Sequence, residues 1–239
     1  MVRRRSFLAG VAMAIVVLAA CGGEHVPAAS PSTDEAPSAT TTSTDPPTTV
    51  ATTSTTSTTT TTPPPPPVPA PPPPPPGDGS TVLMIGDSVM LGAAPNLSEL
   101  AGWSVSVDAS ISRQFGGSYA DTGVQAVEAH AADATLPSRV VVHLGTNGPI
   151  RQSDLDQMMA LLGDRHVVFV TVHVPDHPDI EGVVGDLLAA NQARYPNIAV
   201  ADWQGLAAGN PAWFAGDPDR VHPDAAGRQA YANLIGGLL

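Results

Sequence analysis

Three short segments of the sequence contain side chains that together could carry out nucleophilic catalysis. They are Gly86-Asp87-Ser88, Gly145-Thr146-Asn147-Gly148 and Asp219-Arg220-Val221-His222. A serine hydroxyl becomes a strong nucleophile only when a neighbouring base removes its proton, and His222 can do this near neutral pH. Asp219 can hold the imidazole in the required tautomer and stabilise its cation. These residues predict a Ser88–His222–Asp219 triad.

The same segments also contain donors for the negative charge that develops on an attacked carbonyl oxygen. The backbone N–H of Ser88 and the side-chain amide of Asn147 are the candidates, and the glycines beside them allow substrate to approach the backbone closely. Each segment alone has a simpler explanation, because Ser88 could cap a helix and residues 145–147 could form a turn. Their combination is much more specific than any single segment.

Short apolar runs rich in β-branched residues predict strands that are buried on both faces. The runs cover residues 81–85, 105–109, 139–144, 166–172 and 197–201. Helical spacing of apolar residues between and after them predicts helices over 155–162, 183–191 and 223–238, with a capping box of Ser153 and Asp156 before the first. This alternation predicts an α/β fold with a parallel sheet between two helical layers.

The position of the three segments agrees with this fold. In an open parallel sheet the ligand site lies at the carboxyl ends of the strands. Gly86-Asp87-Ser88 follows the first apolar run, Gly145-Thr146-Asn147 follows the third, and Asp219-x-x-His222 lies beyond the fifth. The candidate catalytic groups should therefore meet at one edge of the sheet.

In its segments and their order, the sequence resembles the SGNH (GDSL-type) hydrolase family over residues 80–239. This resemblance implies a three-layer α/β/α sandwich with a five-stranded parallel sheet, the flavodoxin-like SGNH fold. It also implies that Ser88 is the nucleophile, His222 the base, Asp219 its partner and Asn147 an oxyanion donor. The family usually has a further oxyanion glycine after the second strand. Ser112 stands there in this chain and would offer its backbone N–H.

A narrower likeness is to the extracytoplasmic domain of bacterial peptidoglycan O-acetyltransferases. It is carried by residues 108–114, 142–148, 173–175 and 202–203. The likeness implies transfer or hydrolysis of O-acyl groups on cell-envelope glycans, with an acylated glycan or an acyl donor as substrate. In those proteins the domain follows a membrane-embedded acyl-donating domain, so a separate membrane protein could supply the acyl group here. Further candidates for substrate binding are Arg113, Gln114, Gly145 and Thr146.

Composition excludes several other classes of function. The chain has 239 residues, no lysine and a net charge of −12, so it lacks the clustered cations that nucleic-acid binding requires. Its single Cys rules out an internal disulfide and a cysteine-rich zinc site. Pro175 and Pro178 prevent His173 and His177 from aligning on a helix as metal ligands. We expect no metal, no cofactor and a monomer.

The first 79 residues predict export and anchoring. Arg3, Arg4 and Arg5 precede an apolar run over 7–20 that is too short to span a bilayer, and Leu18-Ala19-Ala20-Cys21 resembles a bacterial lipobox. Residues 1–21 are therefore interpreted as a lipoprotein signal peptide, with Cys21 as the lipidated residue; an ordinary signal with an incidental Cys is the alternative. Residues 22–79, rich in Thr, Ser and Pro, predict a disordered linker rather than a ligand for an SH3-like domain. Together these features predict an extracytoplasmic protein anchored by lipid to the bacterial cell membrane.

A second hypothesis comes from a different class of function. Because Ser112 replaces the expected glycine, the domain could retain the fold as a non-catalytic module that binds cell-wall glycan. Glycan binding without any ester turnover would favour this reading, whereas turnover that depends on Ser88 would favour the enzyme.

Overall fold

The structure, a computed structural model, describes residues 66–74 and 77–239. The predicted signal peptide, Cys21 and most of the predicted linker lie outside the described residues. Within the described part of the chain, the regular elements begin at Thr81. No helix found there is long and apolar enough to cross a membrane.

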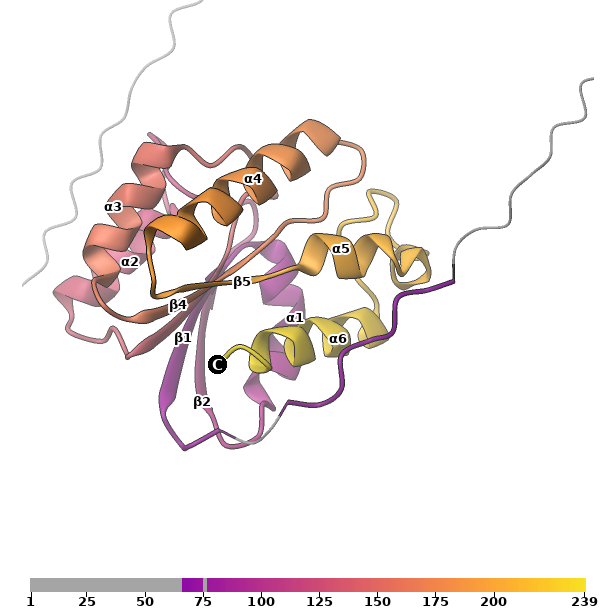
Figure 1. The fold of residues 1–239 in the computed structure, drawn as a ribbon, viewed down its shortest axis with the longest axis horizontal. Helices are drawn as coiled ribbons and strands as arrows, with labels where there is room; N and C mark the ends of the chain where they lie inside the picture. Colours follow the sequence, from indigo (N-terminus) through magenta and orange to yellow (C-terminus); the bar gives the residue numbers. More distant parts are fainter. Residues whose placement is uncertain (1–65, 75–76) are drawn as a thin grey trace, which may run out of the picture. The chain divides into compact units, whose positions relative to one another are not determined.

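A single sheet of five parallel strands forms the centre of the domain (Figure 1). Its strand order is β2-β1-β3-β4-β5, the flavodoxin-like arrangement. The strands are β1 (Thr81–Gly86), β2 (Ser104–Ala109), β3 (Arg139–His143), β4 (His166–Val170) and β5 (Ile198–Ala201). Each of the predicted apolar runs forms a strand, so the predicted parallel sheet is confirmed.

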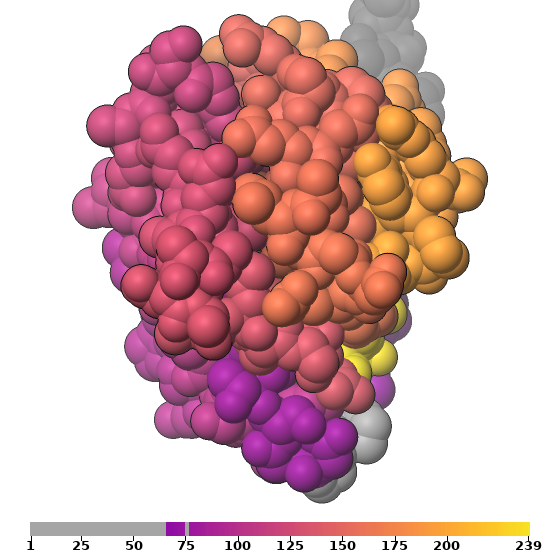
Figure 2. All heavy atoms as spheres, turned by 90° about the vertical axis from the view of Figure 1, so that its left-hand side faces the viewer, coloured from indigo at the N-terminus to yellow at the C-terminus, as the bar shows by residue number. Residues whose placement is uncertain are grey.

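Helices cover both faces of the sheet, which confirms the three-layer sandwich (Figure 1). One face carries α1 (Ser88–Ser98), α5 (Trp203–Ala208) and α6 (Ala225–Gly236), with the short 3-10 helix η1 (Pro211–Phe214). The other carries α2 (Gly123–Ala132), α3 (Gln152–Leu162) and α4 (Pro178–Arg194). Figure 2 shows the domain from this side with all heavy atoms drawn.

Alternation of side chains along each strand produces two separate cores. In β1, Val82 and Met84 join the core under α1 and α6, whereas Leu83 and Ile85 join the core under α2 and α3. All four are at most 2% exposed. Burying an aliphatic side chain of this size contributes about 1.5–3 kcal/mol, so the continuous apolar run stabilises both layers at once.

Local details of the helices differ from the sequence-based predictions. The capping box expected at Ser153 and Asp156 is wrong: the N-cap residue of α3 is Arg151, two residues earlier, and it makes no side-chain cap hydrogen bond. A capping box does form at α2, between Thr122 and Gln125. Capping depends on the backbone angles of one residue, which a residue spacing alone does not determine.

Residues 66–74, the described part of the Pro-rich segment, run along the outside of the domain near α5 and α6 (Figure 1). The side-chain amide of Asn210 donates to the Val68 carbonyl at 2.9 Å, and that of Asn233 donates to the Pro71 carbonyl at 3.0 Å. The Val68 N–H donates to the Gly209 carbonyl at 3.1 Å. Proline carbonyls have no partner within a polyproline segment, which explains why side-chain donors can fix this one to the domain.

We predict that Asn233→Ala lowers the free energy of unfolding by about 1 kcal/mol, because the Pro71 carbonyl loses its donor. Urea denaturation of the whole protein measures the effect. Gln157→Ala is the control, since the side chain of Gln157 makes an exposed bond to Glu128. Equal midpoints for Asn233→Ala and the wild type would contradict the prediction.

Candidate active site

Ser88 and His222 meet at the carboxyl edge of the sheet although 134 residues separate them. Ser88 is the first residue of α1, directly after β1, and its Oγ lies 3.0 Å from Nε2 of His222. Ser88 is not the helix cap, because the Asp87 carboxylate takes that role by accepting the Val89 N–H at 3.0 Å. The hydroxyl is therefore free to face the imidazole at a distance suited to proton transfer.

The carboxylate nearest to the other ring nitrogen belongs to Asp217. Its Oδ2 lies 3.4 Å from Nδ1 of His222, and the same oxygen accepts the backbone N–H groups of Val221 and His222, each at 2.7 Å. Partial burial opposes ionisation, but these two backbone donors and the His222 ring outweigh it, so the pKa of Asp217 is lowered. An ionised carboxylate here can orient the ring and stabilise its cation.

Asp219, the partner expected from the sequence, lines the same cleft but has no hydrogen bond or ion pair with His222 in the described part of the chain. The cause is the backbone between them. Arg220 has a φ of 56°, a left-handed conformation, and its N–H donates to the Asp217 carbonyl at 3.1 Å. This turn brings the carboxylate of Asp217, instead of that of Asp219, next to Nδ1 of His222.

Asn147 lies in the loop after β3 and lines the cleft together with Ser88. Its Nδ2 donates to the Arg113 carbonyl at 3.2 Å and lies 3.5 Å from Oδ2 of Asp87. The loop needs its glycines, because Gly145 and Gly148 have φ values of 120° and 149°, which other residues rarely adopt. The amide therefore sits on a tight turn that is bonded to the loop after β2.

Ser112 belongs to that loop after β2. It is exposed, has a φ of 61° and is not among the residues that line the cleft. A non-glycine residue in this left-handed region costs about 1–3 kcal/mol. The strain explains in physical terms why a glycine was expected at this position. Ser112 still has the backbone N–H group that a glycine would have.

The cleft beside Ser88 has a volume of about 260 Å³. Of the predicted site residues, it brings together Ser88, Thr146, Asn147, Asp219 and His222; the other lining residues are Val174, Asp176, His177 and Val221. Gly145 lies outside the lining, packed near Val184 and Ile150. Gln114 is also not among the lining residues. Its Oε1 packs against Gly148, 3.5 Å from the position that a Cβ on this glycine would occupy.

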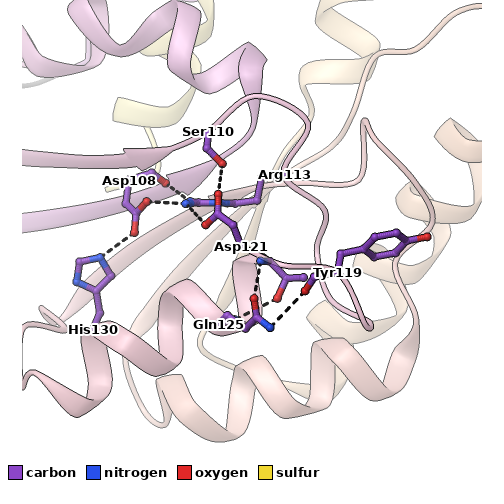
Figure 3. Close-up of polar contacts among 8 residues, drawn as sticks. Asp108, Ser110, Arg113, Tyr119, Asp121, Gln125 and His130 are labelled. Atoms are coloured by element: carbon purple, nitrogen blue, oxygen red, sulfur yellow. Dashed lines mark hydrogen bonds and ion pairs between the residues drawn. The ribbon is translucent and has the colours of Figure 1, made fainter. Parts of the chain in front are cut away.

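Arg113 also differs from its predicted role in substrate binding. It is only 6% exposed and its guanidinium is bonded to Asp108 and Asp121 (Figure 3). Figure 3 shows these groups with Ser110 and His130 in one polar cluster between the β2 loop and α2. The fork of Arg113 is thus occupied by protein carboxylates, and Arg113 is not among the residues that line the cleft.

Two further histidines lie near the cleft but are buried. His143 is fully buried: its Nδ1 lies 2.8 Å from the Tyr231 hydroxyl, and its Nε2 has no hydrogen-bond partner in the described part of the chain. His173 is 8% exposed, and its Nδ1 lies 3.1 Å from Oε1 of Glu181. Among residues 66–74 and 77–239, no three His, Cys, Asp or Glu side chains form a group that could hold a metal ion.

Comparisons with known proteins relate this domain to acyl-transferring enzymes. The chain is 29% identical over 157 residues to the peptidoglycan O-acetyltransferase OatA of Listeria monocytogenes, and 30% identical over 156 residues to the O-acetyltransferase OatA of Staphylococcus aureus. Each alignment covers 65% of this chain, but only 23% of the first protein and 24% of the second. No family model matches the chain.

Solved structures give the same relationship. The C-terminal catalytic domain of Streptococcus pneumoniae OatA, solved with a methylsulfonyl adduct, superimposes with a TM-score of 0.57 at 27% identity, covering 68% of this chain and 94% of that domain. A lipase/acylhydrolase from Enterococcus faecalis superimposes with a TM-score of 0.55 at 15% identity, covering 66% and 93%, and supports the fold alone. The domain therefore has the SGNH hydrolase fold. It is homologous to enzymes, the OatA O-acetyltransferases, and is similar to the C-terminal catalytic domain of one of them.

The buried histidines lead to a prediction about stability and pH. Burial lowers the pKa of His143 and of His173 below the value of about 6.5 that holds in the unfolded chain. The unfolded state therefore binds protons that the folded state excludes, so stability is complete above about pH 6.5 and falls as the pH drops through that value. For a histidine that is protonated in the unfolded state and neutral in the folded state, the free energy of unfolding falls by about 1.4 kcal/mol per pH unit.

Urea midpoints measured between about pH 7.5 and about pH 5.5 test this expectation. His143→Gln keeps an acceptor for the Tyr231 hydroxyl but cannot titrate, so its midpoint should change less over this range than that of the wild type. If both proteins show the same pH dependence, His143 is not a source of the effect.

Proposed function

We propose that the protein is a serine-dependent enzyme that transfers or hydrolyses O-acetyl groups on cell-envelope glycans. The observation that carries this proposal is the 3.0 Å contact between Oγ of Ser88 and Nε2 of His222, at the wall of an open cleft. The glycan as substrate rests on the names of the relatives, which are peptidoglycan and other O-acetyltransferases.

The geometry supports a two-step mechanism. In the first step Nε2 of His222 accepts the Ser88 proton while Oγ attacks the carbonyl carbon of the ester. Negative charge collects on the carbonyl oxygen, where the Ser88 N–H, the Asn147 amide and the Ser112 N–H are the proposed donors. The tetrahedral intermediate then collapses, the protonated His222 gives its proton to the departing alcohol, and an acetyl group remains on Ser88.

The second step decides between the two activities. A water molecule or a sugar hydroxyl attacks the acetyl-Ser88 carbonyl, and His222 takes the proton of the attacking group. Water gives acetate and makes the protein an esterase, whereas a sugar hydroxyl gives a new ester and makes it a transferase. Both activities use the same serine, imidazole and oxyanion donors. The proposal therefore includes both outcomes for a glycan hydroxyl at the mouth of the cleft.

The proposed location places the enzyme next to its substrate. Lipidation of Cys21 would hold the protein on the outer face of the cell membrane, and residues 22–65 would join the anchor to the domain. A separate membrane protein would supply the acetyl group if the activity is transfer. The alignments cover only 23% and 24% of the two relatives, so what the rest of each relative does is not carried over to this chain. The separate membrane protein that supplies the acetyl group is therefore a proposal.

The alternative of a non-catalytic glycan-binding module rested on Ser112 in place of glycine. Ser112 has a φ of 61°, the left-handed conformation that a glycine would supply. Ser112 therefore adopts this backbone conformation and keeps its N–H group without a glycine, and the Ser88–His222 contact is also present. These two observations favour the enzyme over the binding module.

The nucleophile can be tested with an activated ester. The whole protein is expected to hydrolyse 4-nitrophenyl acetate, and Ser88→Ala should lower kcat by at least about 10³-fold because no other group can form the acyl-enzyme. Ser98→Ala, on the same helix but bonded to the Ala94 carbonyl at the surface, should act as the wild type does. Equal rates for Ser88→Ala and the wild type would refute the proposal.

The same assay separates transfer from hydrolysis. Adding a soluble amino-sugar oligomer to the reaction gives acetylated sugar if the acceptor is a glycan hydroxyl, and only acetate if the acceptor is water. Mass spectrometry of the sugar pool measures the ratio of the two products.

The partner of His222 can be identified with two matched substitutions. Asp217→Asn should lower kcat by about 10²–10⁴-fold because the ring loses the carboxylate at Nδ1, whereas Asp219→Asn should stay within about tenfold of the wild type. The lowered pKa of Asp217 keeps it ionised under mildly acidic conditions. A large loss in Asp219→Asn with little loss in Asp217→Asn would show that Asp219 is the partner.

A further inference from the structure

Arg113 is a buried cation that the mechanism above does not use. Its Nη1 donates to the backbone carbonyl of Asp108 at 2.7 Å, and its Nη2 contacts Oδ1 of Asp108 and Oδ1 of Asp121, each at 2.8 Å (Figure 3). The Arg113 side chain is 5% exposed. A buried charge persists only when it is paired and hydrogen-bonded, so these contacts fix the side chain in one place.

The contacts of Arg113 also fix the loop to which it belongs. Asp108 lies in β2, whereas Asp121 lies just before α2, so the guanidinium ties the two ends of the loop together. Each carboxylate has a second partner, because the Ser110 hydroxyl donates to Asp121 at 2.5 Å and Nε2 of His130 lies 3.1 Å from Asp108. Two residues of this segment, Ser112 and Asp121, have left-handed backbones, a conformation that persists only where the surroundings hold it.

The main chain of Arg113 connects this cluster to the cleft. Its carbonyl accepts one hydrogen of the Asn147 amide at 3.2 Å. An Asn side chain has an oxygen and an NH₂ group that exchange places when the amide rotates by half a turn. The Arg113 carbonyl accepts only from NH₂, so it selects the orientation in which the NH₂ group of Asn147 faces this carbonyl. The contact with Asp87, at 3.5 Å, is too long to compete strongly for the second hydrogen. That second hydrogen is therefore available to a substrate oxygen.

We propose that Arg113 is a positioning residue of the oxyanion hole: its side chain clamps the β2 loop so that its own carbonyl holds the Asn147 amide ready to donate into the cleft. The inference rests on the proposed function, because it assigns Asn147 the role of oxyanion donor. It replaces the expectation that Arg113 binds substrate directly. Removing the guanidinium should impair the transition state while substrate binding changes little.

A double-mutant cycle tests this coupling. Arg113→Met removes the charge but keeps much of the chain length, and should lower kcat for 4-nitrophenyl acetate by about 10–10²-fold with KM within about threefold, as expected for a misplaced donor. Asn147→Ala should cost about 10²–10³-fold. If Arg113 acts through Asn147, the double variant should be no slower than Asn147→Ala alone. Multiplication of the two losses would overturn the proposal.

Two further variants separate positioning from a general loss of stability. Arg113→Lys keeps the charge without the fork and should recover part of kcat but not all of it. Arg194→Met removes an arginine that pairs with Asp156 at the surface, and should leave kcat unchanged. If Arg113→Met proves unfolded at the assay temperature, Asp121→Asn serves in its place, because it removes one carboxylate from the clamp.

The side-chain amide of Asn147 gives a second measurement that does not need turnover. Its ¹H–¹⁵N NMR signals should shift or broaden in Arg113→Met and in Asp121→Asn, and should not change in Arg194→Met. Unchanged signals in the first two variants would overturn the positioning role. Absence of ester turnover in the wild-type protein would instead refute the proposed function, so the two failures can be told apart.

Discussion

The hydrogen bond between the Ser88 hydroxyl and the His222 imidazole is the interaction on which the account depends. It joins residues 134 positions apart, so only the tertiary fold can make it. β1 lies inside the sheet and delivers Ser88 at its carboxyl end, while α6 packs beside α1 on the same face and fixes the loop that carries His222. Met90 of α1 and Tyr231 of α6 belong to one buried cluster. The core that stabilises the fold therefore also sets the distance between the Ser88 hydroxyl and the His222 imidazole.

The side of the cleft that carries Asn147, the proposed oxyanion donor, is built differently, from two loops that are bonded to each other. The loop after β3 presents Asn147 on a turn that needs two glycines, and the loop after β2 holds the amide through the carbonyl of Arg113. The second loop contains left-handed residues at Ser112 and Asp121, and the ion pairs of Arg113 oppose that strain. A donor aimed in this way needs no reorganisation when charge develops on the substrate, which is the main source of its effect on rate.

The sequence predicted the sheet well because strands buried on both faces leave a signal that is continuous and local. Each apolar run became a strand, with bounds that differ by at most two residues. The sequence predicted less well where one backbone angle or a distant partner decides the outcome. The left-handed turn at Arg220 exchanges Asp219 for Asp217 beside His222, and residue spacing contains no sign of it. The sequence suggested Arg113 as a substrate-binding residue, yet it is buried and paired with Asp108 and Asp121, and their approach depends on how β2 and α2 pack.

Covalent labelling tests the convergence of Ser88 and His222 most directly, because it needs neither a known acyl donor nor a known glycan. A sulfonyl fluoride reacts with a serine whose neighbour removes the proton, so the whole protein should gain one sulfonyl group, and peptide mapping should place it on Ser88. His222→Ala should slow the labelling by at least about 10²-fold, the usual contribution of a positioned base. Labelling of a different serine, or an equal rate in His222→Ala, would contradict the account.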